Sequence, residues 1–570
     1  MHTGRTQSFG CLVAFLADPV VALFVSLALG YGIGLLRVGP IQVGGVCGTL
    51  FVALLIGQLG VSIDADLKNT AFALFIFALG FTAGPQFFAN VRSGWRYGFL
   101  SIIEVVSVLA LLALAVHFLR LDPGTAAGLF AGSATESAVI GTASEALGRL
   151  DLPADEIARL QSNIATAYSV TYLFGLVAIV VFTTQIAPLL LRINLREEAA
   201  ALAKTYGADE EEDVAEGLPA LVGRAFQAGP IAGSSVGEFE RSRKSAITIE
   251  RIKRGREIIE TTPDLLIEPD DIVFVLGRRN ALIAAQERLG SEVPVPANTN
   301  LPLTKRDIVL VRKEAFGLRI SELRRLAATD LRRGVFIESI RRLGRTVPTL
   351  PGTVLEEGDI LTLYGSEPAV ARASAELGND LPPTNKTDFI FLGLGIVAGL
   401  LLGSLSLRWG ALDVTLGTGG GALVAGLFFG WLHMHFPRHG ALPIAAADFM
   451  KEFGLATFIA AVGLSAGPDA IQLIQQYGLI LPALGILVSA LPALASLIIG
   501  TLVLKIEAPI LLGAIAGQHC STPTISALVS NAGNSIPVIG YTVTYAISNV
   551  LLPLMGPVVV SIAVAMTMPV

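Results

Sequence analysis

Two short polar stretches interrupt the apolar sequence of this 570-residue chain. Gly132–Ser137 carries hydroxyl groups and Glu136, and Gln518–Thr524 carries hydroxyl groups, His519 and Pro523. An interrupted helix leaves backbone N–H groups at the start of the following half-helix, and their dipole favours an anion. We therefore predict that both stretches bind a small carboxylate, using Gly132, Ser133, Thr135, Glu136, Ser137, Gln518, His519, Ser521, Thr522 and Thr524.

Structural roles remain open for the same residues. Ser and Thr in membrane helices often bond back to carbonyl groups of their own helix. Glu136 can bind an ammonium group or a proton, or serve as a hydrogen-bonded structural carboxylate. His519 can face a substrate or a loop. Glu104 lies in a long apolar segment with no motif around it, so we expect it to be protonated or to snorkel.

Matching Gly-Pro pairs occur in both halves of the chain, at Gly84-Pro85 and Gly467-Pro468. Proline removes a backbone donor and glycine permits unusual backbone angles, so both pairs are predicted to break helices. Pro523 is predicted to do the same in the second polar stretch. A plain bend near the end of a span is the alternative.

Both polar stretches lie at equivalent places in a duplicated sequence. Three small-residue patterns recur in the same order, although independent apolar helices have no reason to share that order. The matches pair Ala73–Pro85 with Ala456–Pro468, Gly128-x-x-Ala131-Gly132 with Gly513-x-x-Ala516-Gly517, and Tyr168-x-Val170-Thr171-Tyr172 with Tyr541-x-Val543-Thr544-Tyr545.

Composition indicates a polytopic α-helical membrane protein, because 53% of the residues are hydrophobic and only 15% are charged. A crossing needs roughly 20 apolar residues. We predict five crossings per half, plus one re-entrant or broken segment rich in Gly, Ser and Thr at 122–148 and at 508–531. The crossings are expected at 18–36, 41–60, 69–90, 97–120 and 162–190, and at 388–406, 413–433, 442–467, 476–503 and 536–566.

The central part of the chain is predicted to be a water-soluble α+β domain, since residues 192–386 hold 28 of the 40 Lys and Arg. Five crossings, an odd number, would make the two repeats inverted, and positive charge on the inner loops favours an outer N-terminus. Full crossing by the weak segments would make the repeats parallel. Either topology leaves the central domain in the cytoplasm. The predicted divisions are 1–191, 192–217 (linker), 218–296, 297–386 and 387–570.

The central domain contains a repeat of its own. Residues 264–277 align with 352–365, pairing Glu268 with Glu356 and Asp271 with Asp359. Each copy is an acidic turn followed by a strand and a helix. The copies resemble the C-terminal subdomain of potassium-conductance regulatory (RCK) domains, which implies either a small regulatory ligand or a structural dimer module. No dinucleotide fingerprint precedes either copy.

The order of all these segments resembles the aspartate:alanine exchanger family. The resemblance implies a secondary transporter in a bacterial inner membrane, whose best-known activity is exchange of aspartate for alanine. By analogy with other inverted-repeat carriers, we expect alternating access with elevator-like motion in a homodimer. The residues that carry the resemblance are Gly80–Phe88, Gly128–Ala143, Ser521-Thr522-Pro523, Tyr541–Tyr545 and the two central modules.

Other functional classes remain open. RCK-like modules commonly gate potassium channels, but neither half contains a Thr-Val-Gly-Tyr-Gly filter. A membrane enzyme using Glu136 and His519 would need a nucleophile with a spaced base, or a metal cluster, and neither is found. A uniporter or symporter for another carboxylate is a further alternative. The three cysteines, Cys11, Cys47 and Cys520, indicate no disulfide or metal site, and neither a cofactor nor a nucleic-acid partner is expected.

Overall fold

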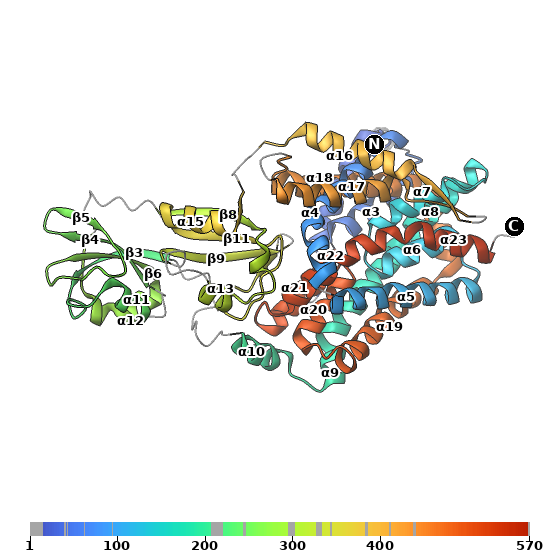
Figure 1. Ribbon diagram of the computed structural model, residues 1–570. Helices are drawn as coiled ribbons and strands as arrows, with labels where there is room; N and C mark the ends of the chain where they lie inside the picture. The colour runs from blue at the N-terminus through green and yellow to red at the C-terminus, as the bar shows by residue number, and fades with distance from the viewer. Residues whose placement is uncertain are drawn as a thin grey trace, which may run out of the picture. The chain divides into compact units, whose positions relative to one another are not determined.

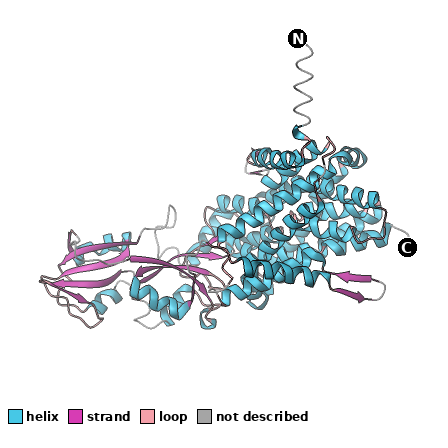
Figure 2. Cartoon of the chain, turned by 90° about the horizontal axis from the view of Figure 1, so that it is seen from above, coloured by secondary structure: helices cyan, strands magenta, loops and turns pink. Residues whose placement is uncertain are grey.

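The chain divides into two compact units in this computed structural model. A helical unit contains Met1–Ala200 and Thr384–Val570, and a second unit contains Ala201–Pro383 (Figure 1). Figure 2 shows that the strands gather mainly in the second unit. Cys11 and residues 207–217 of the predicted linker lie outside the described residues. Those are 15–38, 41–42, 44–61, 63–93, 95–206, 221–242, 247–294, 303–326, 333–342, 345–381, 386–409, 412–436 and 440–567.

The helices of the two halves correspond one to one. In both halves an aspartate, Asp18 or Asp388, caps the first helix by accepting hydrogen bonds from its first-turn N–H groups. A short antiparallel hairpin follows that helix: β1 (Arg37–Val38) with β2 (Ile41–Gln42), or β13 (Ser406–Trp409) with β14 (Leu412–Thr415). The first half contains α2 (Pro19–Gly34), α3 (Gly45–Gly57), α4 (Ala65–Ser93), α5 (Trp95–Leu119), α6 (Pro123–Ser133), α7 (Ala138–Leu147), α8 (Ala154–Val181) and, after a π-helical turn, α9 (Ala187–Leu191). The second half contains α16 (Phe389–Ser404), α17 (Gly417–His435), α18 (Ile444–Tyr477), α19 (Ile480–Leu502), α20 (Ala508–Gln518), α21 (Thr522–Ala532), α22 (Pro537–Leu554) and α23 (Gly556–Thr567).

Six helices of the described residues are long and apolar enough to cross a membrane, three from each half. The other two predicted crossings of each half correspond to α2 and α3, and to α16 and α17. Of these, α2 and α16 have 16 residues and α3 has 13, so length alone does not make them full crossings. The predicted weak segments are each broken into two short helices, α6–α7 and α20–α21, which confirms the expected interruptions.

Helices of one half pack on helices of the other half, in two equivalent pairs. The third helix of each half packs along the second helix of the other, as α4 on α17 and α18 on α3. The α4–α17 contact is close because glycines from both helices interlock: a Cβ at Gly80 or Gly84 would clash with the α17 backbone, and one at Gly426 or Gly430 with the α4 backbone. Small residues at such positions let helix backbones approach closely in membrane proteins. Neither half can therefore complete its packing alone.

The predicted break at Gly84-Pro85 is wrong, because α4 continues through Pro85. Proline removes the hydrogen bond to the carbonyl four residues earlier, which here belongs to Phe81. The Cα of Gly430 on α17 packs directly against that oxygen, where a Cβ would clash. Cα–H···O contacts of this kind offset part of the lost hydrogen bond. Gly84 therefore allows α4 to pack closely on α17 and does not interrupt α4.

The predicted break at Gly467-Pro468 is wrong for the same reason. Helix α18 runs through Pro468, and the freed carbonyl of Leu464 lies against Gly57 of α3. Two neighbouring carbonyls of α18 accept hydrogen bonds from side chains: Gln58 Nε2 donates to Gly467 O, and Ser162 Oγ donates to Ala466 O at 3.2 Å. The helix continues through Pro468 because residues elsewhere in the chain contact the carbonyl groups of α18 around it.

The central unit consists of two modules with the same topology. Each is a five-stranded antiparallel sheet, in the order β5-β4-β6-β3-β7 or β10-β9-β11-β8-β12. The predicted linker begins with a helix, α10 (Leu195–Thr205). The first module contains β3 (Leu221–Ala228), α11 (Val236–Ser242), β4 (Ile247–Arg254), β5 (Glu257–Glu260), β6 (Ile272–Arg278), α12 (Arg279–Leu289) and β7 (Gly290–Val293). The second contains β8 (Leu303–Leu310), α13 (Ile320–Leu326), β9 (Val335–Arg342), β10 (Arg345–Val347), β11 (Ile360–Ser366), α15 (Glu367–Leu377) and β12 (Gly378–Asp380).

Replacing Gly430 by Ala tests the interlocked glycines. The new Cβ would clash with Phe81 O, so we expect a loss of about 1–3 kcal/mol of stability, as for an overpacked core. Gly393→Ala on α16 is the matched control, because a Cβ there meets nothing within 4 Å. Thermal unfolding of the full-length protein in detergent measures both. Equal melting temperatures for the two variants would contradict the role of Gly430.

Candidate functional site

The two helix breaks have the same backbone structure. After α6, the N–H of Glu136 donates to Ala131 O at 2.9 Å, and after α20, the N–H of Ser521 donates to Ala516 O at 3.2 Å. Both are Schellman endings, in which the residue before the donor adopts the left-handed conformation. That residue is Thr135 in the first break, with φ 51°, and Cys520 in the second, with φ 48°.

Thr135 and Cys520 are unusual at these positions. Glycine normally occupies the left-handed position of a Schellman ending, because a Cβ is strained there, and a β-branched residue such as Thr135 is strained most. Strained backbone persists only where surrounding contacts hold it, and it clusters at functional sites. Its presence at equivalent points of both halves marks the breaks as candidate binding elements.

The half-helices that follow the breaks are capped differently. In the first break, Glu136 Oε1 accepts a hydrogen bond from the N–H of Ala138 at 3.0 Å, at the start of α7. In the second, Ser521 Oγ accepts from the N–H of Thr524 at 3.4 Å, at the start of α21. Pro523 lies in the first turn of α21, where a missing N–H costs little. One cap therefore carries a carboxylate and the other is neutral.

The two breaks contact each other inside the helical unit. Thr135 Oγ1 donates a hydrogen bond to the carbonyl of His519. Ser489 of α19 joins both breaks, because its hydroxyl donates to Ser133 O at 2.7 Å and its carbonyl lies 3.2 Å from His519 Nε2. The Cys520 thiol lies beside the Glu136 carboxyl. Residues far apart in the sequence thus form one buried cluster.

The repeated sequence motifs hold the breaks in place. In each half, a Cβ on the last glycine of the Gly-x-x-Ala-Gly motif, Gly132 or Gly517, would clash with the threonine hydroxyl of the Tyr-x-Val-Thr-Tyr motif, Thr171 or Thr544. These motifs therefore recur together because α6 packs on α8 and α20 packs on α22. Tyr168 of the same motif has its hydroxyl 2.6 Å from Ser137 Oγ.

Seven of the ten predicted site residues lie at the breaks with buried side chains: Ser133, Thr135, Glu136, Ser137, His519, Ser521 and Thr524. Gly132 serves packing. Gln518 points elsewhere, toward Leu100 O of α5 and Ser496 Oγ of α19, and Thr522 is exposed.

Sequence reasoning missed the partner of His519. Glu104 Oε1 of α5 lies 2.8 Å from His519 Nδ1, and each side chain is only 1% exposed, so Glu104 does not snorkel. The sequence did contain an indication of this role for Glu104, because an ionisable residue in the middle of an apolar span is a functional candidate by default. Ser489 and Cys520 were also missed: Ser489 lies in no motif, whereas Cys520 lies within the predicted stretch Gln518–Thr524.

The acidic turns of the central modules form structural ion pairs. Arg254 and Asp271 share two hydrogen bonds of 2.8–2.9 Å in the first module, and Arg342 and Asp359 share two of 2.7 Å in the second. Burial raises the pKa of Asp271, but hydrogen bonds from Arg254 and a backbone N–H outweigh it and leave the pKa lowered. The resulting stabilisation is present above pH about 4 and is lost as the pH falls.

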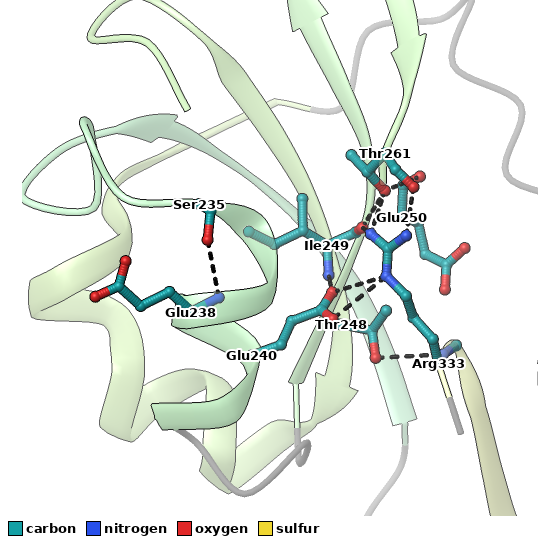
Figure 3. A network of polar contacts seen from close by, with 9 residues as sticks. Ser235, Glu238, Glu240, Thr248, Ile249, Glu250, Thr261 and Arg333 are labelled. Carbon is teal, nitrogen blue, oxygen red and sulfur yellow. Dashed lines mark hydrogen bonds and ion pairs between the residues drawn. The ribbon is translucent and has the colours of Figure 1, made fainter. Parts of the chain in front are cut away.

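A polar network joins the two modules within the central unit (Figure 3). Arg333 of the second module lies 3.3 Å from both carboxylate oxygens of Glu240 and donates to Ile249 O at 2.9 Å. It also donates to the hydroxyl and carbonyl of Thr261. Burial raises the pKa of Glu240, and Arg333 offsets only part of that rise. Arg333 thus fixes one module against the other.

Family comparisons agree with this division of the chain. Residues 22–188 and 391–561 match the Asp-Al_Ex family model, described as a predicted permease membrane region. Residues 227–290 and 316–378 each match the TrkA-C domain. An uncharacterized transporter of Zymomonas mobilis is 37% identical over 554 residues, covering 95% of this chain and 97% of that protein.

Other bacterial relatives are similar over the same length. An uncharacterized transporter of Bordetella parapertussis is 36% identical, covering 96% of this chain and 98% of its own, and one of Bradyrhizobium diazoefficiens is 35% identical, covering 95% and 97%. No solved structure matches significantly. Together with the six apolar helices, these matches define a multi-pass membrane transporter. The chain belongs to the aspartate:alanine exchanger family, with two TrkA-C domains between its membrane halves.

Replacing Asp359 by Asn tests the structural role of the acidic turns. Arg342 is 1% exposed and would lose the carboxylate that it pairs with through two hydrogen bonds, so we expect a loss on the order of 3 kcal/mol. Asp271→Asn is the matched change, and its cost should be smaller because Arg254 is 31% exposed and water can solvate it. Calorimetry of the full-length protein in detergent measures both. Equal costs would contradict this assignment.

Proposed function

We propose that this protein is a secondary transporter that exchanges small amino acids or carboxylates, most specifically aspartate for alanine. One observation carries the proposal: equivalent helix breaks from the two halves meet in a buried cluster, through Thr135 and His519. Non-helical backbone is tolerated at membrane depth only where protein or a water-filled cavity satisfies its polar groups. Paired broken helices at a repeat interface are the usual setting of a transporter's substrate site.

The unequal caps favour a substrate with both an ammonium and a carboxylate group. When its carboxyl is ionised, Glu136 places a negative charge at the start of α7, which repels a substrate carboxylate and attracts an ammonium group. The start of α21 has only the neutral Ser521 cap, so its dipole is free to attract a carboxylate. Ser133 Oγ is buried and has no hydrogen-bond partner among the described residues, which leaves it available as a donor. An α-amino acid fits this pattern.

Transport would proceed by alternating access around this one site, which serves both directions of an exchange. Each half completes the packing of the other through the helix pairs α4–α17 and α18–α3, and we take the two halves to be inverted repeats. We extend the proposal to elevator-like motion in a homodimer, in a bacterial inner membrane, with the central modules in the cytoplasm. The modules would respond to a small ligand only by binding it more tightly in one transport state than in another.

Uptake of labelled aspartate into proteoliposomes tests the function. Vesicles are preloaded with alanine, with aspartate or with buffer alone. We expect uptake only with a preloaded amino acid, because an exchanger returns to its starting state with substrate bound. Uptake into buffer-loaded vesicles would instead indicate a uniporter or symporter. Rapid flux without saturation would indicate a channel.

Glu136→Gln tests the ammonium contact. Glutamine keeps an acceptor for the Ala138 N–H, so the cap and the fold should remain, while the negative charge is lost. We expect the apparent affinity for amino acids to fall by about tenfold or more, corresponding to the loss of a charge-assisted hydrogen bond. Concentration dependence of exchange measures it. Unchanged exchange would remove Glu136 from the substrate site.

A further inference from the structure

Few ionisable side chains of the described residues surround the Glu104–His519 pair, and the basic residue of α5 before Glu104, Arg96, donates to Leu504 O. Glu104 comes from α5 and His519 ends α20, and each is 1% exposed. Helices α19 and α20, which flank the pair, contain no ionisable residue, and α22 contributes only tyrosines. The ionisable side chains of the adjoining breaks are Cys520 and Glu136. No lysine or arginine side chain is among the groups that act on His519.

The geometry around the His519 ring requires an extra proton. His519 Nε2 lies 3.2 Å from Ser489 O, and a carbonyl oxygen can only accept, so Nε2 carries a hydrogen. Nδ1 lies 2.8 Å from Glu104 Oε1. A bare Nδ1 and an ionised carboxylate are both acceptors and would repel at that distance. A second acceptor, the carbonyl of Ile515, also lies close to the ring.

We propose that Glu104 and His519 form a proton-binding site that holds one proton in this conformation. The proton resides either on the carboxyl, facing neutral imidazole, or on Nδ1, facing carboxylate. The pair has no net charge in either form. Adding or removing a proton would leave one uncompensated charge in an apolar site, which is costly.

Losing this proton would loosen the second break. Without it, His519 can keep Nε2–H toward Ser489 and face the Glu104 carboxylate with a lone pair, or move the hydrogen to Nδ1 and lose Ser489. Either choice breaks a contact between the break and α5 or α19. Because Ser489 also holds Ser133, and the His519 carbonyl holds Thr135, the disturbance reaches the first break as well.

The consequence for transport rests on the proposed function. A conformation that binds the proton more tightly is favoured at low pH, and by linkage the proton alters the equilibrium between transport states. Exchange should therefore depend on pH through this pair. Proton binding itself does not depend on the identity of the substrate, so the two statements can be tested separately.

The first test measures thermal stability against pH in detergent, without substrate. Free Glu and His side chains titrate near pH about 4.3 and about 6.5, so above about pH 6.5 the unfolded chain releases the proton that the folded pair holds. Stability should then fall as the pH rises. In Glu104→Gln the amide N–H can donate to Nδ1 without an added proton, so this part of the slope should vanish.

Ser548→Ala is the matched control, because Ser548 Oγ donates to Ser101 Oγ of α5 at 3.1 Å in an equally buried contact that cannot titrate. It should keep the wild-type slope. If Glu104→Gln does not fold, the double variant Glu104→Gln/His519→Gln serves instead, since neither amide can titrate. A wild-type slope in whichever of these two variants is measured would overturn the proton site.

The second test measures amino-acid exchange in proteoliposomes at several pH values. We expect the wild-type rate to change by about tenfold between about pH 6 and pH 8, and the Glu104→Gln rate to change by clearly less. Wild-type exchange without pH dependence would overturn the coupling. If no substrate is exchanged but the stability slope depends on Glu104, the proposed function fails and the proton site stands.

Discussion

The constraint on which the structure depends is that every backbone N–H and C=O group at membrane depth must find a partner inside the protein. Each break meets it with a Schellman ending and a side-chain cap, and one hydrogen bond, from Thr135 to the carbonyl of His519, joins the two breaks. The two prolines meet it with a glycine of a neighbouring helix. The Schellman bonds and the caps are local to each break, whereas Thr135, Ser489 and the packed glycines Gly430 and Gly57 join residues of different halves, so part of what satisfies the backbone also binds the halves together.

The duplication makes the differences between the halves informative. The left-handed residues and Schellman hydrogen bonds are the same in both breaks, so duplication alone accounts for them. The caps are not the same. The first half has Glu136 where the second half has Ser521. The second half has His519, paired with Glu104, where the first half has Ala134. All the charge in the cluster arises from these departures, and a site that recognises a polar substrate needs such asymmetry.

The sequence predicted the two halves, the inserted modules and the broken segments. Close helix contacts require small residues at fixed spacings, and the duplication repeats that pattern in both halves. Sequence reasoning failed at Pro85, because the outcome depends on Gly430, a residue of the other half. It failed at Gln518 and Glu104 for a similar reason: a side chain's direction is set by its tertiary partners. The Gly-Pro motif indicates only that a backbone hydrogen bond is lost. The residues that contact the freed carbonyl group lie elsewhere in the chain.

The central modules place a limit on where a regulatory ligand could act. Their acidic turns are the most apparent repeated feature of the sequence, yet Asp271 and Asp359 are fully occupied by Arg254 and Arg342 in equivalent geometry. A ligand bound to those carboxylates would have to break a bidentate ion pair, and in the second module the arginine is almost fully buried. Charge-assisted pairs of this kind are costly to break when buried. A ligand would more readily act on the contact between modules, where Arg333 is the shared group, because a small rotation there changes polar contacts without unfolding either sheet.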